Sequence, residues 1–290
     1  MKPASFDYLR VHSVEEALTA LHDGPEDSKI IAGGQSLVPL LNFRLAEPAL
    51  LIDINDLHEL SFVRRVGGAL RIGALTRHST LEKSAVVRDG WPLLQEAVRF
   101  VAHPQIRSRG TIGGSVAHAD SAAELPVALA ALDAEFVTRS VSGSRRIPWR
   151  DFFLGPMTTA LEPGELLVEV RVPLLRKSHG HAFVEHTRRN GDFALAGAGV
   201  VLDLNSDRRC SRISVALLGA APTPVRATDA EDCLLGAVIT EERAARAAKM
   251  AAEAGSPSGD LHGSVAYHRS LLEVVVRRAI LAANLRVQEP

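Results

Sequence analysis

The sequence predicts an α+β protein with two domains, and three observations lead to this prediction. At roughly 150 residues for each domain, a chain of 290 residues has room for two. Strand and helix patterns alternate around a Gly-Gly turn in the first part of the chain, whereas antiparallel hairpin patterns begin at residue 61. Hydrophobic residues make up 46% of the chain, enough for each domain to bury a core.

The N-terminal lobe is expected to start with a capped helix. Ser13 and Glu16 form a capping box, and the apolar spacing that follows predicts a helix that stops near Gly24. A strand–helix–strand unit comes next, because two short apolar runs flank a Gly-Gly turn and a helical segment. Its parts are a strand at 29–32, a helix at 36–41 and a strand at 49–54.

Antiparallel structure is expected in a second lobe. Gly67-Gly68 separates two β-patterned runs between residues 61 and 75, and suits the positive φ angles of a tight hairpin. A helix over 91–102 ends before Pro104, which pushes the preceding residue out of the helical region. Residues 103–115 have no periodicity and are expected to form a loop. The remaining elements are a helix from about 121 to 132, a hairpin over 135–149 and a strand over 166–172.

A polar segment near residues 175–180 marks the expected domain boundary. The first domain is expected over residues 1–176, with lobes at about 1–56 and 57–176, and the second over residues 177–290. In the second domain, three β patterns separated by polar turns predict a meander, and two helical patterns predict a cover for it. The strands are expected at 181–187, 194–204 and 212–218, and the helices at 241–254 and 265–287.

Composition narrows the functional classes. The formal charge of −1 gives no reason to expect a nucleic-acid partner. The sequence shows neither a signal peptide nor a membrane-spanning run, so the chain is expected in the cytoplasm. Cys210 and Cys233 are expected to be buried thiols, and two cysteines are too few for a four-cysteine iron–sulfur cluster. The spacing of the histidines with other ligand types predicts no metal site.

Two glycine-rich segments carry the strongest chemical signal. The first glycine loop spans residues 32–36 and the second spans residues 111–115. Glycine lets the backbone approach a ligand closely, and successive N–H groups form a concavity that binds anions. One Gly-Gly pair alone is more often an ordinary turn, but two loops of the same form favour a pyrophosphate held largely by backbone. Neither loop has the Rossmann glycine pattern or the lysine of an NTPase loop.

Five segments together resemble the FAD-binding medium subunits of molybdenum hydroxylases, a family that includes carbon monoxide and xanthine dehydrogenases. They occur in the family's order and cover essentially the whole chain. The segments are AGGQSL at 32–37, LIDI at 51–54, HPQIRSRGTIGGS at 103–115, AELP at 123–126 and RRNGDFA at 188–194.

The resemblance implies a two-lobed FAD-binding domain of the vanillyl-alcohol oxidase type. A smaller domain with a three-stranded antiparallel sheet and a helical bundle follows it. Both glycine loops would bind the FAD pyrophosphate, and an acidic side chain would face the adenosine half of the cofactor. Backbone or apolar contacts would line the flavin. The implied cofactor-binding residues are Ala32, Gly33, Gly34, Gln35, Ser36, Val101, Ala102, Thr111, Ile112, Gly113, Gly114, Ser115, Asp120, Glu124, Leu167 and Phe193.

Several of these positions have a plainer interpretation. Glu124 is otherwise a solvated residue in the first turn of a helix, and Asp120 is otherwise a helix cap. Val101, Ala102 and Leu167 are otherwise core residues. Some relatives have a Tyr beside the isoalloxazine at the position of Phe193, which keeps the aromatic ring without the hydroxyl; its alternative is a place in the core.

Non-covalent FAD is expected, because Gln35 stands where some members of the wider fold attach flavin through a histidine. The resemblance implies an electron-transfer subunit. Its partners would be a small subunit with two [2Fe–2S] clusters and a large subunit with a molybdenum cofactor, and it would pass electrons to an external acceptor. A stand-alone flavoprotein oxidase or dehydrogenase, or a non-redox nucleotide-binding module, remains as an alternative.

Overall fold

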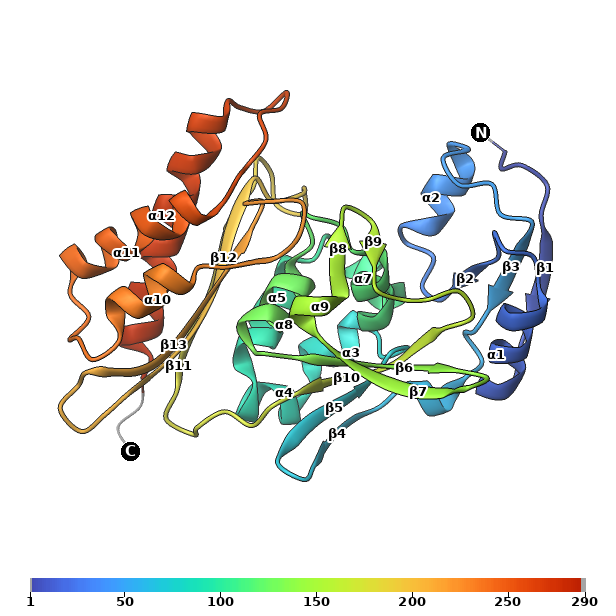
Figure 1. The fold of residues 1–290 in the computed structure, drawn as a ribbon, viewed down its shortest axis with the longest axis horizontal. Helices are drawn as coiled ribbons and strands as arrows, with labels where there is room; N and C mark the ends of the chain where they lie inside the picture. Colours follow the sequence, from blue (N-terminus) through green and yellow to red (C-terminus); the bar gives the residue numbers. More distant parts are fainter. Residues whose placement is uncertain (1, 288–290) are drawn as a thin grey trace.

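A computed structural model describes residues 2–287, and Figure 1 shows three lobes arranged in a row. Strand β1 lies at one end of the row, a helix-covered antiparallel sheet lies in the middle, and helix α12 lies toward the other end. This mixed α/β architecture agrees with the predicted fold class at the level of helices, sheets and their succession along the chain.

The N-terminal lobe is a parallel sheet of three strands in the order β1-β3-β2. The predicted strand–helix–strand unit is present, and its loop follows the carboxyl end of β2. Strand β1 was not predicted, because all four of its residues are exposed and its sequence has no alternation of apolar and polar residues. The elements are β1 (Asp7–Arg10), α1 (Val14–Asp23), β2 (Lys29–Ile31), α2 (Leu37–Asn42) and β3 (Leu50–Asp53).

The central lobe is built on an antiparallel sheet in the order β4-β5-β10-β6-β7, with its helices packed together beside that sheet (Figure 1). Its core includes the three contacting rings of Phe136, Phe152 and Phe153. The strands are β4 (Val63–Val66), β5 (Ala69–Gly73), β6 (Glu135–Ser140), β7 (Gly143–Pro148) and β10 (Leu166–Val172). A separate small hairpin consists of β8 (Phe153–Gly155) and β9 (Thr158–Thr159). The helices are α3 (His78–Lys83), α4 (Ala85–Gly90), α5 (Pro92–Phe100), α6 (Pro104–Arg109), α7 (Ile112–His118), α8 (Glu124–Ala131) and α9 (Trp149–Phe152), with a 3-10 turn η1 (His58–Leu60) before β4.

The expectation of a loop over residues 103–115 is wrong, because the segment folds into α6 and the start of α7. Pro104 occupies the first turn of α6, a position where its missing N–H costs no hydrogen bond. Thr111 caps α7 by accepting a hydrogen bond from the amide of Gly114 at 3.1 Å. These helices have only 6 and 7 residues, too few to establish a helical hydrophobic period.

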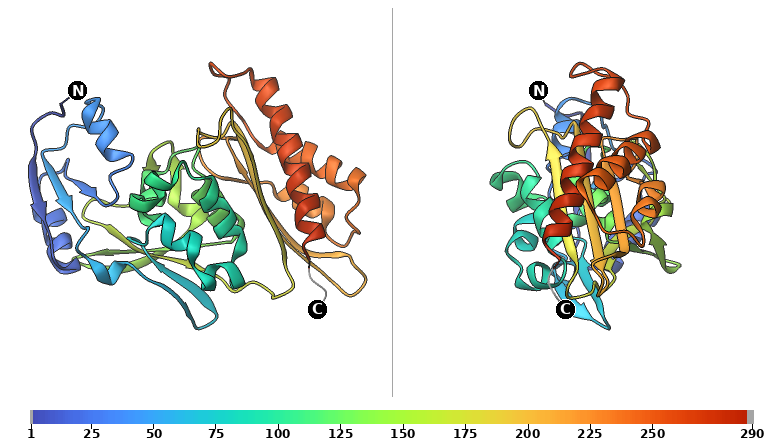
Figure 2. Two further views of the ribbon diagram at one scale, coloured as in Figure 1. Left: turned by 180° about the vertical axis from the view of Figure 1, so that it is seen from behind. Right: turned by 90° about the vertical axis from the view of Figure 1, so that its left-hand side faces the viewer.

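The C-terminal domain is a four-stranded antiparallel sheet in the order β11-β12-β13-β14. The predicted meander is present, but the expected count of three strands is wrong because β14 adds a fourth. With two residues, β14 is too short to show alternation in the sequence. Helices α11 and α12 lie together on one face of this sheet (Figures 1 and 2). The elements are β11 (Gly180–His186), β12 (Ala196–Leu204), β13 (Cys210–Leu218), β14 (Val225–Arg226), α10 (Thr228–Leu234), α11 (Glu241–Ala254) and α12 (Val265–Leu285).

The opposite face of this sheet packs against α5 and α8, so residues of this sheet extend the core of the central lobe, while the helix-covered face has a core of its own. Arg226 fastens the edge of the sheet to the end of α8. Its Nη1 donates to the carbonyl of Ala130 at 3.0 Å and to Asp133 Oδ1 at 2.7 Å. Its Nε donates to Glu231 Oε1 at 2.7 Å. The guanidinium side chain is only 9% exposed, so its removal would leave buried carboxylate charge without a partner.

We expect Arg226→Gln to lower the free energy of unfolding by about 3 kcal/mol, because Glu231 is then buried without its cation. Urea denaturation of the purified chain measures this loss. Arg246→Gln is the matched control, since Arg246 forms only an exposed pair with Glu242 and should cost less than about 0.5 kcal/mol. Equal midpoints for the two variants would contradict the proposed role of Arg226.

Candidate functional site

The first glycine loop follows β2, and its backbone N–H groups have no hydrogen-bond acceptor within the described residues. Gly34 has a φ of +73°, a conformation that favours glycine. The Asn55 side-chain amide donates to the carbonyl of Ala32 at 2.7 Å, and Gln35 Nε2 donates to the carbonyl of Gly33 at 3.0 Å. Among residues 2–287, no protein acceptor takes a hydrogen bond from the backbone N–H of residues 33–36. Four successive free amides form the kind of concavity that accepts an anion.

The two glycine loops meet through Gly33. A Cβ at this position would lie 2.3 Å from the carbonyl oxygen of Arg109 and 2.9 Å from Gly110 Cα. The residue before the second loop therefore packs directly on the first loop, at a distance that only glycine permits. Residues about 75 positions apart in the sequence thus form one continuous surface.

The second glycine loop is built differently from the first. The amides of Ile112 and Gly113 donate to carbonyl oxygens in segment 74–76 at 3.0 and 2.8 Å, and the amide of Gly114 donates to the Thr111 hydroxyl. Ile112 and Gly113 are buried, whereas Gly114 is exposed. The expectation that both loops offer successive free amides is therefore wrong for the second loop, because the central lobe already occupies these donors.

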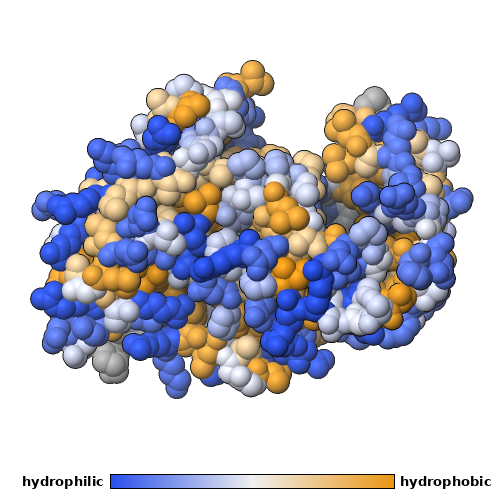
Figure 3. Space-filling view, viewed as in Figure 1, coloured by the Kyte–Doolittle hydropathy of each residue, from blue (hydrophilic) through white to orange (hydrophobic). Residues whose placement is uncertain are grey.

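A pocket of about 470 Å³ lies beside the first loop. Figure 3 shows an indentation that separates the N-terminal lobe from the rest of the surface. Besides the loop, the pocket is lined by residues from β2, α2, the end of β3 and α6, among them Asp53, Asn55 and Arg109. Polar groups at the carboxyl ends of parallel strands are typical of ligand sites in α/β folds.

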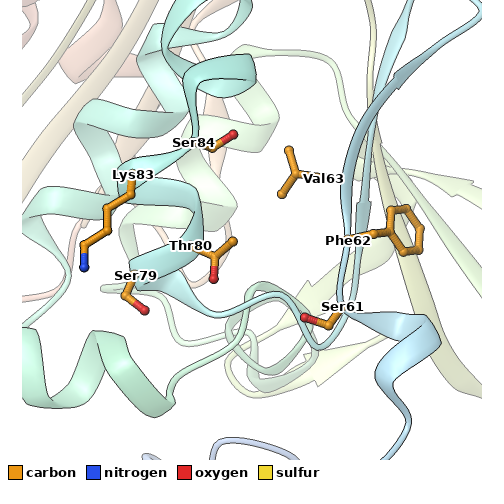
Figure 4. Close-up of a pocket in the computed structure, with 7 residues that line it drawn as sticks. All are labelled: Ser61, Phe62, Val63, Ser79, Thr80, Lys83 and Ser84. Carbon is orange, nitrogen blue, oxygen red and sulfur yellow. The ribbon is translucent and has the colours of Figure 1, made fainter.

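A larger pocket of about 620 Å³ lies between β4 and helices α3 and α4 (Figure 4). Its polar groups are the hydroxyls of Ser61, Ser79, Thr80 and Ser84 and the ammonium group of Lys83. Ser84 already caps α4 by accepting from the Val87 amide. This pocket contains none of the predicted site residues.

Arg107 and Arg109 have different roles. Arg107 is buried, pairs with Glu82 at 3.0 Å, and donates to the carbonyls of Val101 and Ala102 at 3.1 and 3.2 Å. Ala102 has a φ of +40°, an unusual conformation for a residue with a Cβ, and Arg107 holds this bend from one side. Arg109 is exposed and lines the pocket, so its charge is free to meet a ligand.

Two carboxyl groups with raised pKa values, the buried Glu124 and the half-buried Glu185, lie where the central lobe meets the C-terminal domain. Glu124 begins α8 and is 8% exposed, which excludes a solvated first-turn residue. Burial and then the charge of Asp120 raise the pKa of Glu124 to about 7. On β11, burial and the charge of Glu124 raise the pKa of Glu185 to about 8, and its Oε2 is buried without a hydrogen-bond partner.

The remaining predicted residues occupy three different environments. Asp120 Oδ1 accepts from the Ala122 amide at 2.9 Å and forms a turn before α8, so the cap alternative is wrong. Leu167 lies in β10 and is 4% exposed within the central core. Phe193 is 72% exposed in the loop between β11 and β12, which excludes its core alternative. Gly191 of that loop packs on the His103 ring, at the start of α6.

Three residues of this region were not predicted as site residues: Asp53, Asn55 and Arg77. Asp53 and Asn55 follow an apolar strand at its carboxyl end, a signal that the sequence did contain. Arg77 had no such signal, because its partners lie 22 and 32 residues away in the chain.

Residues 2–287 contain neither a cluster of side chains arranged to bind a metal ion nor a disulfide bond. No three His, Cys, Asp or Glu side chains are placed to hold a metal ion, and both cysteines in this part of the chain are free. Cys210 is buried, whereas Cys233 is half-buried, so the expectation of a fully buried thiol is wrong for Cys233. Within these residues, none of the helices combines the length and the hydrophobicity that a membrane span needs.

Two family models match the chain. The FAD binding domain in molybdopterin dehydrogenase matches residues 4–175, and the CO dehydrogenase flavoprotein C-terminal domain matches residues 181–283. The chain is 46% identical over 288 residues to the 6-hydroxypseudooxynicotine dehydrogenase complex subunit alpha of Paenarthrobacter nicotinovorans, covering 99% of this chain and 97% of the relative.

Solved structures agree with this similarity. The chain matches a structure of carbon monoxide dehydrogenase from Hydrogenophaga pseudoflava with a TM-score of 0.94 at 40% identity. The match covers 99% of this chain and 100% of that chain. It is also 40% identical to the nicotine 6-hydroxylase medium subunit of Paenarthrobacter nicotinovorans, covering 99% of this chain and 100% of the relative.

The raised pKa of Glu185 predicts a pH-dependent stability. The folded chain holds a proton that the unfolded chain releases near pH 4.5, so stability falls as pH rises from about 4.5 to about 8. Glu185→Gln removes this loss, and we expect the variant to gain on the order of 2 kcal/mol over wild type at pH 8.5. At pH 4.5 the two proteins should be nearly equal.

Urea denaturation at both pH values measures the difference. Glu253→Gln, at an exposed position on α11, is the control and should follow the wild-type profile. If Glu185→Gln raised the free energy of unfolding by the same amount at both pH values, the charge of Glu185 would not be the cause of the stabilisation.

Proposed function

The chain belongs to the FAD-binding medium subunits of the molybdenum hydroxylases, and on that premise we propose an electron-transfer role for it. It takes electrons from the [2Fe–2S] clusters of a partner small subunit and passes them through FAD to an external acceptor. A partner large subunit with a molybdenum cofactor completes the complex. When bound, FAD supplies the redox chemistry, and the protein supplies binding and orientation.

The single observation that carries this proposal is the first glycine loop with its four free amides beside the 470 Å³ pocket. A diphosphate accepts hydrogen bonds from such amides without requiring a lysine. The second loop contributes the exposed backbone of Gly114 and the hydroxyl of Ser115, while Thr111, Ile112 and Gly113 support them from the central lobe. Arg109 adds positive charge at the junction of the loops.

The other predicted residues serve the remaining parts of the cofactor. The Glu124 carboxyl accepts from hydroxyl groups of the adenosine half, a role that is supported by its burial without a side-chain hydrogen-bond partner among the described residues. Val101 and Ala102 present backbone toward the flavin, and Leu167 supports them from the core. Phe193 offers its exposed ring to the flavin face. Asp120 shapes the turn that aims Glu124.

The cofactor is held without a covalent bond. Gln35 stands in the first loop where a histidine would be needed for attachment, and its side chain is tied to the carbonyl of Gly33. The finer fold assignment belongs to the same proposal: an FAD-binding unit of the vanillyl-alcohol oxidase type over residues 1–176, with lobes at about 1–56 and 57–176, and a C-terminal unit over 177–290. A cytoplasmic location, which the two free cysteines support, completes it.

The substrate of the complex is chosen outside this chain. Relatives that are 46% and 39% identical to it are named for 6-hydroxypseudooxynicotine and for carbon monoxide, two molecules with little chemistry in common. Similar FAD chains therefore serve unlike substrates, which supports placing substrate recognition on the molybdenum-bearing partner.

The first test is the visible absorption spectrum of the purified chain, followed by acid precipitation and chromatography of the supernatant. We expect a flavin spectrum and the release of FAD into the supernatant, because the cofactor is not covalently attached. A colourless chain that does not take up added FAD would overturn the electron-transfer role and favour a nucleotide-binding module without redox activity.

A second test is Gly33→Val, which we expect to abolish FAD retention during gel filtration. The added Cβ would collide with the carbonyl of Arg109 and push the two loops apart. Gly114→Val should weaken retention, because its Cβ would displace the Thr111 hydroxyl at 2.8 Å. Gly90→Val, where a Cβ meets no atom within 4 Å, is the control and should retain FAD. If both loop variants retained FAD as well as wild type, the proposal that the two loops together bind the cofactor would be wrong.

A further inference from the structure

Arg77 lies between the two glycine loops and touches both sides of their junction. Its Nη1 donates to the carbonyl oxygen of Arg109, the same oxygen that packs on Gly33. Its backbone forms an isolated β-bridge with Thr111, the first residue of the second loop. Arg77 is therefore attached to the second loop by its main chain and to the residue at the end of α6, just before that loop, by its side chain.

The other branch of the guanidinium group reaches the first loop through Asn55. Arg77 Nη2 donates to Asn55 Oδ1 at 2.8 Å, and Asn55 Nδ2 donates to the carbonyl of Ala32 at 2.7 Å. Asp53 fixes the asparagine, because its Oδ1 accepts from the backbone and side-chain amides of Asn55 at 2.9 and 2.6 Å. One guanidinium thus connects a carbonyl of the first loop, through Asn55, with the carbonyl of Arg109 just before the second loop.

The positive charge of Arg77 is not neutralised by a direct ion pair. Among residues 2–287, the acceptors of its guanidinium are two uncharged oxygens, the carbonyl of Arg109 and Asn55 Oδ1. Partial burial, and next the charge of Arg109, lower the pKa of Arg77. The Asp53 carboxylate, which is bonded to Asn55, acts on Arg77 in the opposite direction, without a direct ion pair. An arginine that is partly withdrawn from water, with no carboxylate in direct contact and beside a second arginine, favours an anion at this junction.

We propose that Arg77, oriented by Asn55, is a positioning residue that holds the two glycine loops at the separation a diphosphate requires. This inference rests on the proposed FAD site and assigns the residue that sets its width. The planar guanidinium suits this task because its two branches reach two acceptors at once, which a lysine ammonium does not do with the same geometry.

The test is a double-mutant cycle on FAD affinity, measured by titrating the FAD-free chain with FAD and following flavin fluorescence. Arg77→Gln and Asn55→Ala should each raise the FAD dissociation constant roughly tenfold or more, the loss expected for a charge-assisted hydrogen bond. Because both changes break the same connection, the double variant should bind no more than about threefold more weakly than the weaker single variant. Arg88→Gln, an exposed arginine of α4, is the control and should bind like wild type.

Two further measurements separate positioning from charge and from general damage. Arg77→Lys keeps the charge but loses the fork, so it should bind as weakly as Asn55→Ala. Inorganic pyrophosphate, used as a competitor of FAD, should have an inhibition constant that rises by the same factor as the FAD dissociation constant. A variant that has only lost stability would show a lower melting temperature without this matched change.

Three results would overturn the inference while leaving the FAD site intact. These are wild-type affinity in Arg77→Lys or Asn55→Ala, losses that multiply in the double variant, and an unchanged inhibition constant for pyrophosphate. Failure of the wild-type chain to bind FAD is a different result, which would overturn the proposed function itself. If Arg77→Gln does not fold, Arg77→Lys and Asn55→Ala still decide the question.

Discussion

The contact between Gly33 and the carbonyl of Arg109 is the constraint on which the rest of the site depends. It joins a loop of the N-terminal lobe to the end of α6 in the central lobe, at a distance that excludes a side chain. Because the two segments touch, a small parallel sheet and a larger antiparallel sheet present one surface. The pocket beside this contact is therefore a feature of two lobes together, and neither lobe forms it alone.

The two glycine loops divide the work of binding between them. The first loop keeps four backbone amides free. The amides of the second loop already donate to carbonyls of the segment before α3 and to the Thr111 hydroxyl. Because the second loop is held in place by these hydrogen bonds, the first loop packs on a rigid surface. Donors that are already positioned bind an anion without the entropic cost of ordering them. Charge follows the same division, because Arg107 is neutralised by Glu82 while Arg109 remains exposed.

Sequence reasoning predicted the local structure better than the connections across the fold. The strand over residues 166–172 and the helix over 241–254 have the predicted bounds, because each has a clear apolar pattern. Exposed β1 and the short helix α6 lacked such a pattern and were missed. The glycine loops were recognisable in the sequence, but the amides that remain free could be identified only after the partners of each loop were placed.

The same reason explains why the residues around the loops were harder to predict. Arg77 and Asn55 are 22 positions apart, and nothing in a pattern of hydrophobicity predicts that their side chains meet. The pKa of Glu124 is set mainly by its burial, and this burial depends on how the C-terminal sheet packs against α8. Chemistry that depends on local sequence was therefore predictable, whereas chemistry that depends on packing between lobes needed the structure.

Amide hydrogen exchange with and without FAD tests the unequal division between the loops most directly. On adding FAD, the amides of residues 33–36 should slow strongly, because they gain acceptors that the protein alone does not provide. The amides of residues 112–115 should already exchange slowly and change little. Equal slowing in both loops, or none at residues 33–36, would contradict this account of how the chain holds its cofactor.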